Sequence, residues 1–350
     1  MSGKSRDIKV MQEITEEFFN NCTAKGYDPK ISKEVWRQME SFAGYSFCKA
    51  HSASFAVESY QSLFLKTYYP MEFMVAVLNN YGGFYNRSVY INEARKAGAN
   101  INLPCVNNSS LQANIQGGDI YLGFDCLHNL QKELAVVIPH EREQNGPFSS
   151  LHNFILRIGM SLDQIIILVR AGAFRFTNLS KKALLWEAHL LLSQVKKFET
   201  APLFNCEENK HPVLPSFETG VIEDLYDEIE LMGFPVSGSF FDMVRTEFRG
   251  DAKASNLTTF AGQTVRLLGE FVCDKVVYTK RNEYMKFGSF LDEEGNFFDT
   301  VHFPPSLRKY PPKGAGIYLI LGKVVLDFEY PAIEVEKIAR LPVHPDPRSI

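Results

Sequence analysis

The spacing of apolar residues changes near Gln263, and this change constrains the fold more than any other feature of the chain. Upstream, apolar residues recur every three to four positions, as in amphipathic helices. Downstream, runs such as TVRLLGEFVCDKVVYT alternate with a period of two, as in β-strands. About five such strands, separated by the turn sequences KRNE, DEEGN and YPPKGAG, are typical of a small closed β-barrel. The sequence therefore predicts a multidomain α+β protein in which a helical region precedes a β-barrel.

Capping residues and glycines predict where several helices begin and end. Ser32 is expected to cap a helix that runs from Lys33 to about Phe42, and Ser149 or Ser150 to cap a later one. Two short strands joined by a GGD turn are expected in NIQGGDIYLGF. Further helices are expected at residues 7–20, 53–65, 71–80, 87–97 and 180–198.

Composition limits the class of protein. The chain has 350 residues, of which 45% are hydrophobic and 22% charged, as in ordinary globular proteins of two or three domains. No apolar run has the length of a membrane span, and no apolar signal segment is found, so we expect a cytoplasmic protein with no membrane partner. The six cysteines lack the spacing of a zinc site, which indicates free thiols and no metal.

The net charge of −4 is concentrated in one stretch. Residues 206–250 contain 3 Lys or Arg against 10 Asp or Glu, a balance of −7, whereas residues 1–110 contain 12 against 10, a balance of +2. A DNA-binding surface outside the acidic stretch is therefore permitted by charge but not required by it. The acidic residues of EDLYDEIE fall on a helix that ends at Gly233, where we expect a solvated face.

A lysine, a histidine and several hydroxyl groups precede a long aromatic helix in the segment FAGYSFCKAHSASFAVESYQSLFLKTYYPMEF. Lys49, His51 and Ser52 suit contact with a phosphate through charge, hydroxyl donors and the helix dipole. The alternative is that these residues only cap the helix. The segment resembles the FxGYxFNKSHxxxYA signature in the fingers of C-family polymerases, the bacterial DNA polymerase III alpha subunits. The resemblance implies that the three residues contact an incoming nucleotide or the primer–template.

The segments LGFDCLHNLQKELAVVI, GPFSSLHNFILRI and LVRAGAF resemble the helix-hairpin-helix region of the same family. In that family a glycine hairpin presents backbone N–H groups to a DNA phosphate. The side chains of Leu127 to Leu130 replace these glycines, so we expect the helices to be kept and the DNA contact to be weakened or lost. Lys132, Arg157 and Arg175 are the basic residues expected to touch DNA here, with a solvated surface as the alternative.

A short linker motif suggests a further partner. FETAPLFN, residues 198–205, resembles the QxxLF motif that binds the sliding clamp, with Leu203 and Phe204 as its two apolar anchors and Thr200 in place of the glutamine. The alternative is that this pair packs back onto its own domain.

From Gln263 to Ile338 the chain resembles the OB domain of the family, with the pattern LxGxVxxxxxxxTKxGxxMxFxxLxDxxG. The resemblance implies binding of single-stranded DNA. The residues expected to stack on bases or follow the phosphate backbone are Lys280, Arg281, Tyr284, Lys286 and Phe287, and Phe297, Phe298 and His302 are further stacking candidates. The alternative is that half of the strand aromatics fill the barrel core.

The resemblance covers residues 8 to 340. These residues correspond to the last third of a C-family polymerase and are similar to the accessory or error-prone type of that family. The resemblance implies helical fingers at 1–105, a helix-hairpin-helix and clamp-binding type of domain at 106–198, an acidic linker with one helix at 199–260, an OB-fold barrel at 261–342 and a tail at 343–350.

The catalytic carboxylates of a polymerase are missing from this pattern. Nucleotidyl transfer uses carboxylates that hold two Mg²⁺ ions, and we find no DxD-type pair on adjacent strands. We therefore expect a DNA polymerase III alpha fragment that handles primer–template and single-stranded DNA in replication or repair synthesis, with no catalytic residue and no cofactor of its own. Two alternatives remain: a free-standing single-stranded DNA-binding module, and a chain that complements a separate palm-bearing polypeptide.

Overall fold

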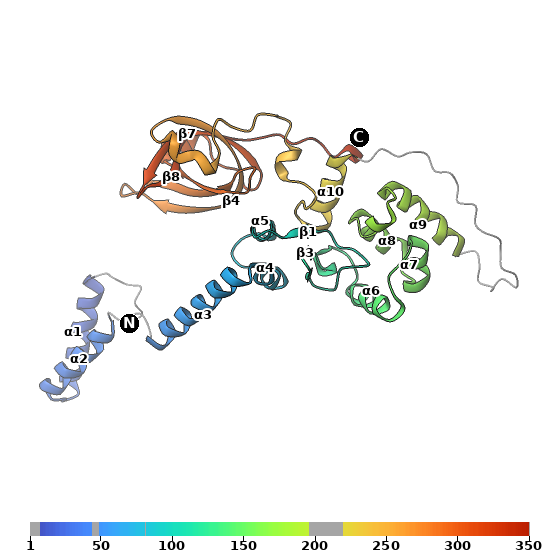
Figure 1. Cartoon of the computed structure of the whole chain (residues 1–350). Coiled ribbons are helices and arrows are strands. Elements are labelled where there is room, and N and C mark those ends of the chain that lie inside the picture. Colours follow the sequence, from blue (N-terminus) through green and yellow to red (C-terminus); the bar gives the residue numbers. More distant parts are fainter. Residues whose placement is uncertain (1–7, 44–48, 81, 196–219, 350) are drawn as a thin grey trace. The chain divides into compact units, whose positions relative to one another are not determined.

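The computed structural model describes residues 8–43, 49–80, 82–195 and 220–349. The chain divides into two compact units, one ending at Tyr69 and the other beginning at Pro70. Helices dominate up to residue 232 and a closed barrel follows, as Figure 1 shows, so the predicted order of a helical region and a β-barrel is confirmed.

The first unit consists of α1 (Ile8–Ala24), α2 (Pro29–Ala43) and α3 (Lys49–Tyr68). Trp36 of α2 is buried against the rings of Phe18 and Phe19, with ring centroids 5.0 Å and 5.9 Å away. The predicted cap at Ser32 is wrong, because α2 already begins at Pro29. The Asp28 carboxylate accepts a hydrogen bond from the Lys30 N–H at 2.7 Å and acts as the cap, and proline favours the first helical position.

The helical part of the second unit has a small three-stranded sheet at its centre. Strand β3 (Asp119–Tyr121) pairs antiparallel with β2 (Asn114–Gln116), which confirms the predicted hairpin, and parallel with β1 (Asn100–Asn102). The helices around it are α4 (Pro70–Asn79), α5 (Arg87–Lys96), α6 (Lys132–Asn145), α7 (Leu151–Ile158), α8 (Leu162–Arg170) and α9 (Lys181–Val195), with one-turn helices η1 (Phe124–Cys126) and η2 (Arg175–Thr177).

Aromatic packing fixes the helices of this region. The rings of Phe148, Phe154 and Phe174 are almost fully buried and meet edge to face, with centroids 4.9 Å and 5.0 Å apart. Ser150 accepts a hydrogen bond from the Asn153 N–H and begins α7, as one of the two predicted caps.

The barrel is closed in the order β4-β5-β6-β8-β7, with β6 and β8 parallel and the other neighbours antiparallel. Its elements are β4 (Thr264–Tyr278), β5 (Tyr284–Leu291), β6 (Phe297–His302), the short helix α11 (Pro304–Lys309), β7 (Ile317–Asp327) and β8 (Tyr330–Arg340). Five strands in this order form an OB-type barrel. Gly269 permits close packing of the core, because a Cβ there would lie 2.6 Å from the Phe298 ring.

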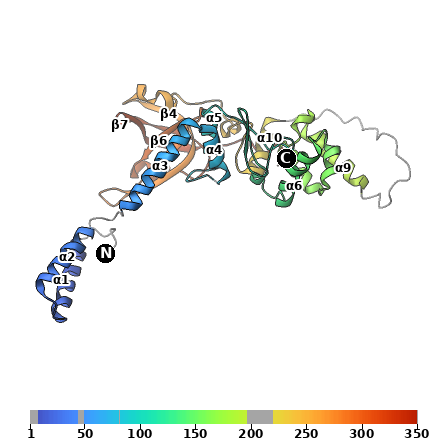
Figure 2. The same ribbon diagram turned by 60° about the horizontal axis from the view of Figure 1, so that its bottom comes forward.

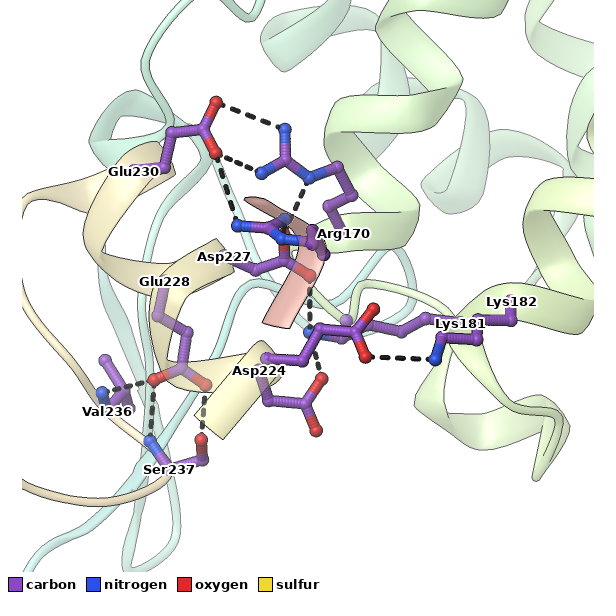
Figure 3. A network of polar contacts seen from close by, with 12 residues as sticks. Arg170, Lys181, Lys182, Asp224, Asp227, Glu228, Glu230, Val236 and Ser237 are labelled. Atoms are coloured by element: carbon purple, nitrogen blue, oxygen red, sulfur yellow. Dashed lines mark hydrogen bonds and ion pairs between the residues drawn. The ribbon is translucent and has the colours of Figure 1, made fainter. Parts of the chain in front are cut away.

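Residues between the helical region and the barrel form α10 (Val221–Met232) and the one-turn helices η3 (Phe240–Met243) and η4 (Ala254–Phe260). The expectation that the acidic face of α10 is solvated is wrong, because Asp227 and Glu228 are 4% and 1% exposed. Asp227 pairs with Arg170 of α8 and Lys181 of α9, as Figure 3 shows, and it also pairs with Arg348.

Glu228 is buried on a different side of α10 and accepts hydrogen bonds from the backbone N–H groups of Val236 and Ser237 and from the Ser237 hydroxyl. A buried carboxylate is stable only with such partners. The acidic helix is therefore a structural element of the second unit.

The segment after the barrel returns to α10, and Figure 1 shows the C-terminal one-turn helix η5 (Pro347–Ser349) beside it. Val343 forms an antiparallel bridge with Val244, and the Tyr226 hydroxyl donates to the His344 carbonyl. The chain thus enters and leaves the barrel at neighbouring points.

Helix α5 contacts the turn between β5 and β6, and Figure 2 shows α5 beside the barrel. The Asn92 amide donates to the Gly295 carbonyl at 2.8 Å, and Lys96 Nζ lies 3.0 Å from Asn296 Oδ1. A Cβ at Gly295 would lie 2.1 Å from Asn92 Oδ1, so this contact requires glycine.

Candidate nucleic-acid interface

The outer side of β5, β6 and β8 carries exposed aromatic side chains. Phe287 is 46% exposed and pairs across the sheet with Lys275 and Val301. Val301 pairs in turn with Glu334 of β8, and Tyr330 lies four positions from Glu334 on the same side of its strand. Tyr330 is 53% exposed, and partial burial together with the Asp299 carboxylate raises its pKa.

The β7–β8 hairpin adds a third aromatic ring. Phe328 at its tip is 99% exposed and has φ 47°, and the next residue, Glu329, has φ 67°. Such left-handed backbone is uncommon outside glycine, and two successive residues of this kind form a tight hairpin turn. The turn therefore holds a large apolar ring in solvent, and strain of this kind gathers at functional positions. We call Phe287, Phe328 and Tyr330 the aromatic face.

Exposed cations lie near one part of the aromatic face. Lys275 is the cross-strand neighbour of Phe287, and Lys280 and Arg281 lie in the exposed β4–β5 turn. Among the residues that the structure describes, none of these three side chains has an ion-pair partner. They are thus available to a phosphate backbone.

Two of the predicted contact residues point the other way. Tyr284 and Lys286 lie an odd number of positions from Phe287, so they fall on the opposite side of β5. The Tyr284 ring lies 4.9 Å from that of Tyr278, and Lys286 Nζ is 2.6 Å from Asp274 Oδ2. Both line a groove of about 460 Å³ beside α11.

Of the other three stacking candidates, two are buried and the third is half-buried beside another ring. Phe298 and His302 are each 1% exposed and lie inside the barrel. Phe297 packs against Tyr85, with ring centroids 6.0 Å apart. Phe328 and Tyr330 were not predicted from the sequence, although an aromatic pair in DFEY at a hairpin turn was a usable signal.

The three basic residues of the helix-hairpin-helix region have different environments. Lys132 is exposed at the start of α6. Arg157 packs over the Phe148 ring at 4.2 Å, with its Nε 3.0 Å from Glu141 Oε1 and further bonds to backbone carbonyls. Arg175 donates to the carbonyls of Gly172 and Leu103 at 2.7 Å and 3.0 Å.

Backbone N–H groups of the predicted hairpin form hydrogen bonds with other parts of the protein. The His128 N–H donates to the Leu231 carbonyl of α10 at 2.7 Å, and the Gln131 N–H to the Gln164 side chain at 2.8 Å. Asn129, with φ 65°, takes the left-handed conformation. Two backbone donors of this turn are therefore already used within the chain.

The remaining predicted residues are placed only in part. Lys49 is the first residue of α3, and His51, exposed two positions later, has its ring 4.4 Å from that of Phe55. Ser52 is half-buried on the same helix. Leu203 and Phe204 lie outside the described residues, as does the segment 44–48.

The described ranges contain neither a metal-binding cluster nor a membrane-spanning helix. No group of three or more His, Cys, Asp or Glu side chains there is arranged to hold a metal ion. None of the helices described is both long and apolar enough to cross a membrane.

Comparison with known proteins places these features in a family. A profile of the helix-hairpin-helix motif matches residues 98–184. The DNA polymerase III alpha subunits of Borreliella burgdorferi and Treponema pallidum are each 29% identical, over 364 and 361 residues. Each match covers 97% of this chain but only 31% and 30% of the relative, so the chain spans about three tenths of their length.

Two further similarities cover smaller parts. The error-prone DNA polymerase of Mycobacterium bovis is 30% identical over 190 residues, covering 53% of this chain and 17% of the relative. The solved second OB-fold domain of replication protein A from Methanococcus maripaludis shares 18% identity and covers 23% of this chain and 85% of its own, with a TM-score of 0.19. Over nearly its whole length, the chain is a homologue of part of the DNA polymerase III alpha subunit, a family that it shares with the error-prone DNA polymerases.

Proposed function

We propose that this chain is a DNA-handling part of a DNA polymerase III alpha subunit and binds single-stranded DNA and the single-stranded part of a primer–template. The aromatic face, with Lys275, Lys280 and Arg281 in the adjoining strand and turn, is the observation that carries the proposal. Aromatic rings stack on bases of any sequence, and lysine and arginine follow the phosphate backbone.

The charge of the barrel predicts how tightly it binds. Residues 261–342 contain 11 Lys or Arg and 11 Asp or Glu, a balance of zero. Long-range attraction of DNA is therefore small, and most of the binding free energy comes from stacking and a few local phosphate contacts. We expect weak binding that falls as salt rises, with a shallow slope set by about three phosphate contacts.

The helix-hairpin-helix region is proposed to contribute less to DNA binding than the barrel. Two of its hairpin amides are bonded within the chain, and Arg157 already has protein acceptors. Lys132 remains as an exposed cation beside the hairpin. Clamp contact through Leu203 and Phe204 and phosphate contact through Lys49, His51 and Ser52 remain predictions from the sequence.

DNA synthesis by this chain alone is not proposed. Phosphoryl transfer with two metal ions needs converging carboxylates, and the described residues hold no such cluster. Primer extension by the purified chain with Mg²⁺ and nucleotides would refute this part of the proposal.

A second candidate function is complementation of a separate chain that carries the rest of the polymerase. Helix α3 supports it, because apolar side chains are exposed around the helix, among them Phe55, Tyr60, Leu63 and Tyr68 at 53%, 72%, 64% and 66%. Several large apolar side chains exposed on one helix are typical of a protein–protein interaction site. Restoration of polymerase activity on mixing the chain with a palm-bearing polypeptide would support this candidate, and α3 variants such as Leu63→Glu should prevent the restoration.

Fluorescence anisotropy with labelled single-stranded and primed DNA tests the proposed function across a salt series. The variant F287A/F328A/Y330A should lose at least tenfold in affinity, because stacking contributes about 1–3 kcal/mol per base. Trp186→Ala on α9 removes an equally exposed aromatic ring outside the barrel and serves as the control. Unchanged binding by the triple variant would show that DNA binds elsewhere, and no binding by the wild type at low salt would refute DNA binding itself.

A further inference from the structure

A cavity of about 370 Å³ lies where the helical region meets the barrel. Helix α5 forms one wall, the segment before and within η3 a second, and the end of β5 with its turn a third. The hydrogen bonds from Asn92 to Gly295 and from Lys96 to Asn296 hold these walls together. Small-molecule sites have volumes from about 300 Å³ upward, so the cavity is large enough for a small ligand.

Most charged groups of this cavity are already engaged. Arg95 donates to the Val236 carbonyl and Lys96 to Asn296. The acidic residues of the turn are also bonded: Asp292 accepts from the backbone N–H groups of Ala254, Glu294 and Asn296, Glu293 pairs with Arg249, and Glu294 pairs with Lys253.

Glu270 of β4 is the exception. It lines the cavity and is partly buried, and no described residue forms a hydrogen bond or ion pair with its carboxylate. Burial raises its pKa to about 7. An unpaired carboxylate in such a place either takes up a proton or binds a cation that enters the cavity.

Part of the lining, between these polar and charged groups, is apolar. Ile91, Pro235, Phe240, Phe241 and Leu291 contribute hydrocarbon surface. A carboxylate without a partner beside this apolar surface suits a ligand with one opposite charge and a short hydrophobic stem.

We propose that this cavity is a binding site for a small organic cation, an amine or amidine with a compact apolar group, held by the Glu270 carboxylate. The site is separate from the aromatic face, and the claim does not depend on DNA binding.

Three probes of similar size test the charge requirement: 3-methylbutylamine, 3-methylbutanol and 3-methylbutanoate, with benzamidine as a second cation. Saturation-transfer NMR with the full chain at pH 8.5 should detect both cations, at least tenfold tighter than the alcohol, and should not detect the carboxylate. Amine affinity should fall towards tenfold per pH unit below about pH 7, because a proton then competes for Glu270. The other charged groups that line the same cavity are Arg95, Lys96, Asp292, Glu293 and Glu294.

Matched variants locate the site. E270Q keeps the shape of the side chain and should abolish cation binding, whereas Glu247→Gln, at an exposed position after η3, should leave it unchanged. Circular dichroism checks that both variants are folded. Equal binding of amine and alcohol, cation binding by folded E270Q, or no cation binding by the folded wild type would each overturn the proposal.

Discussion

Replacing Glu270 by glutamine is expected to stabilise the barrel above pH 7 and to change little at pH 5. Burial raises the pKa of Glu270 from its usual 4.5 to about 7, so the folded state holds the proton more tightly than the unfolded state. The free energy of unfolding therefore falls as the pH rises from about 4.5 to about 7, and stays level above. At about 1.4 kcal/mol per pH unit, the loss amounts to about 3 kcal/mol. E270Q has no such carboxylate and should not show this loss.

Hydrogen exchange of the full chain, read by mass spectrometry in peptides from β4 and β5, measures the free energy of opening the barrel. E270Q should match the wild type at pH 5 and exceed it by about 2–3 kcal/mol at pH 8.5. Glu247→Gln should match the wild type at both pH values. The same pH dependence in wild type and E270Q would refute the reasoning, because it would mean that the carboxylate is as well solvated or paired in the folded chain as in the unfolded one.

Three further substitutions, the first with a matched control, test other parts of the structure. Gly322→Ala places a Cβ 2.4 Å from a carbonyl oxygen of β8 and should cost about 1–3 kcal/mol in thermal denaturation, whereas Gly118→Ala faces open space and should change little. Asp227→Ala leaves three cations without their shared buried partner and should cost about 3–5 kcal/mol in urea denaturation; a change under 1 kcal/mol would contradict its structural role. Burial lowers the pKa of His302 from 6.5 to about 4, so the free energy of unfolding should decrease as the pH falls through this range. His302→Gln should make this decrease smaller in urea denaturation.

The barrel could be predicted from the sequence because both of its signals are local. Alternation with a period of two identifies strands, and turn residues separate them. The helix α11 was missed because its six residues, Pro304 to Lys309, are too few to show a periodic pattern.

The acidic helix shows what a local pattern does not contain. Its spacing indicated an amphipathic helix, and the helix is present. The partners of Asp227 come from Arg170, Lys181 and Arg348, which are remote in sequence, so only the fold reveals that the carboxylate is buried.

The candidate interface was predicted only in part, because it too combines residues that are remote in sequence. Phe287, Lys280 and Arg281 were expected from the resemblance to an OB domain, and the structure exposes them. Tyr330 joins Phe287 only because β8 pairs with β6, a contact between strands that are not consecutive. Tyr284 and Lys286 were grouped with Phe287 although strand alternation places them on the opposite side.

The bridge between Val244 and Val343 has a consequence for how the protein is built. Residues paired across such a bridge have Cα atoms about 5 Å apart, so the roughly hundred residues between them start and finish at one place. The barrel is therefore arranged as an insertion, and a two- or three-residue turn could span the gap that its excision leaves. Such a deletion would separate the helical region from the barrel without disturbing the pairing of α10 with α8 and α9, and each would then be available for study by itself.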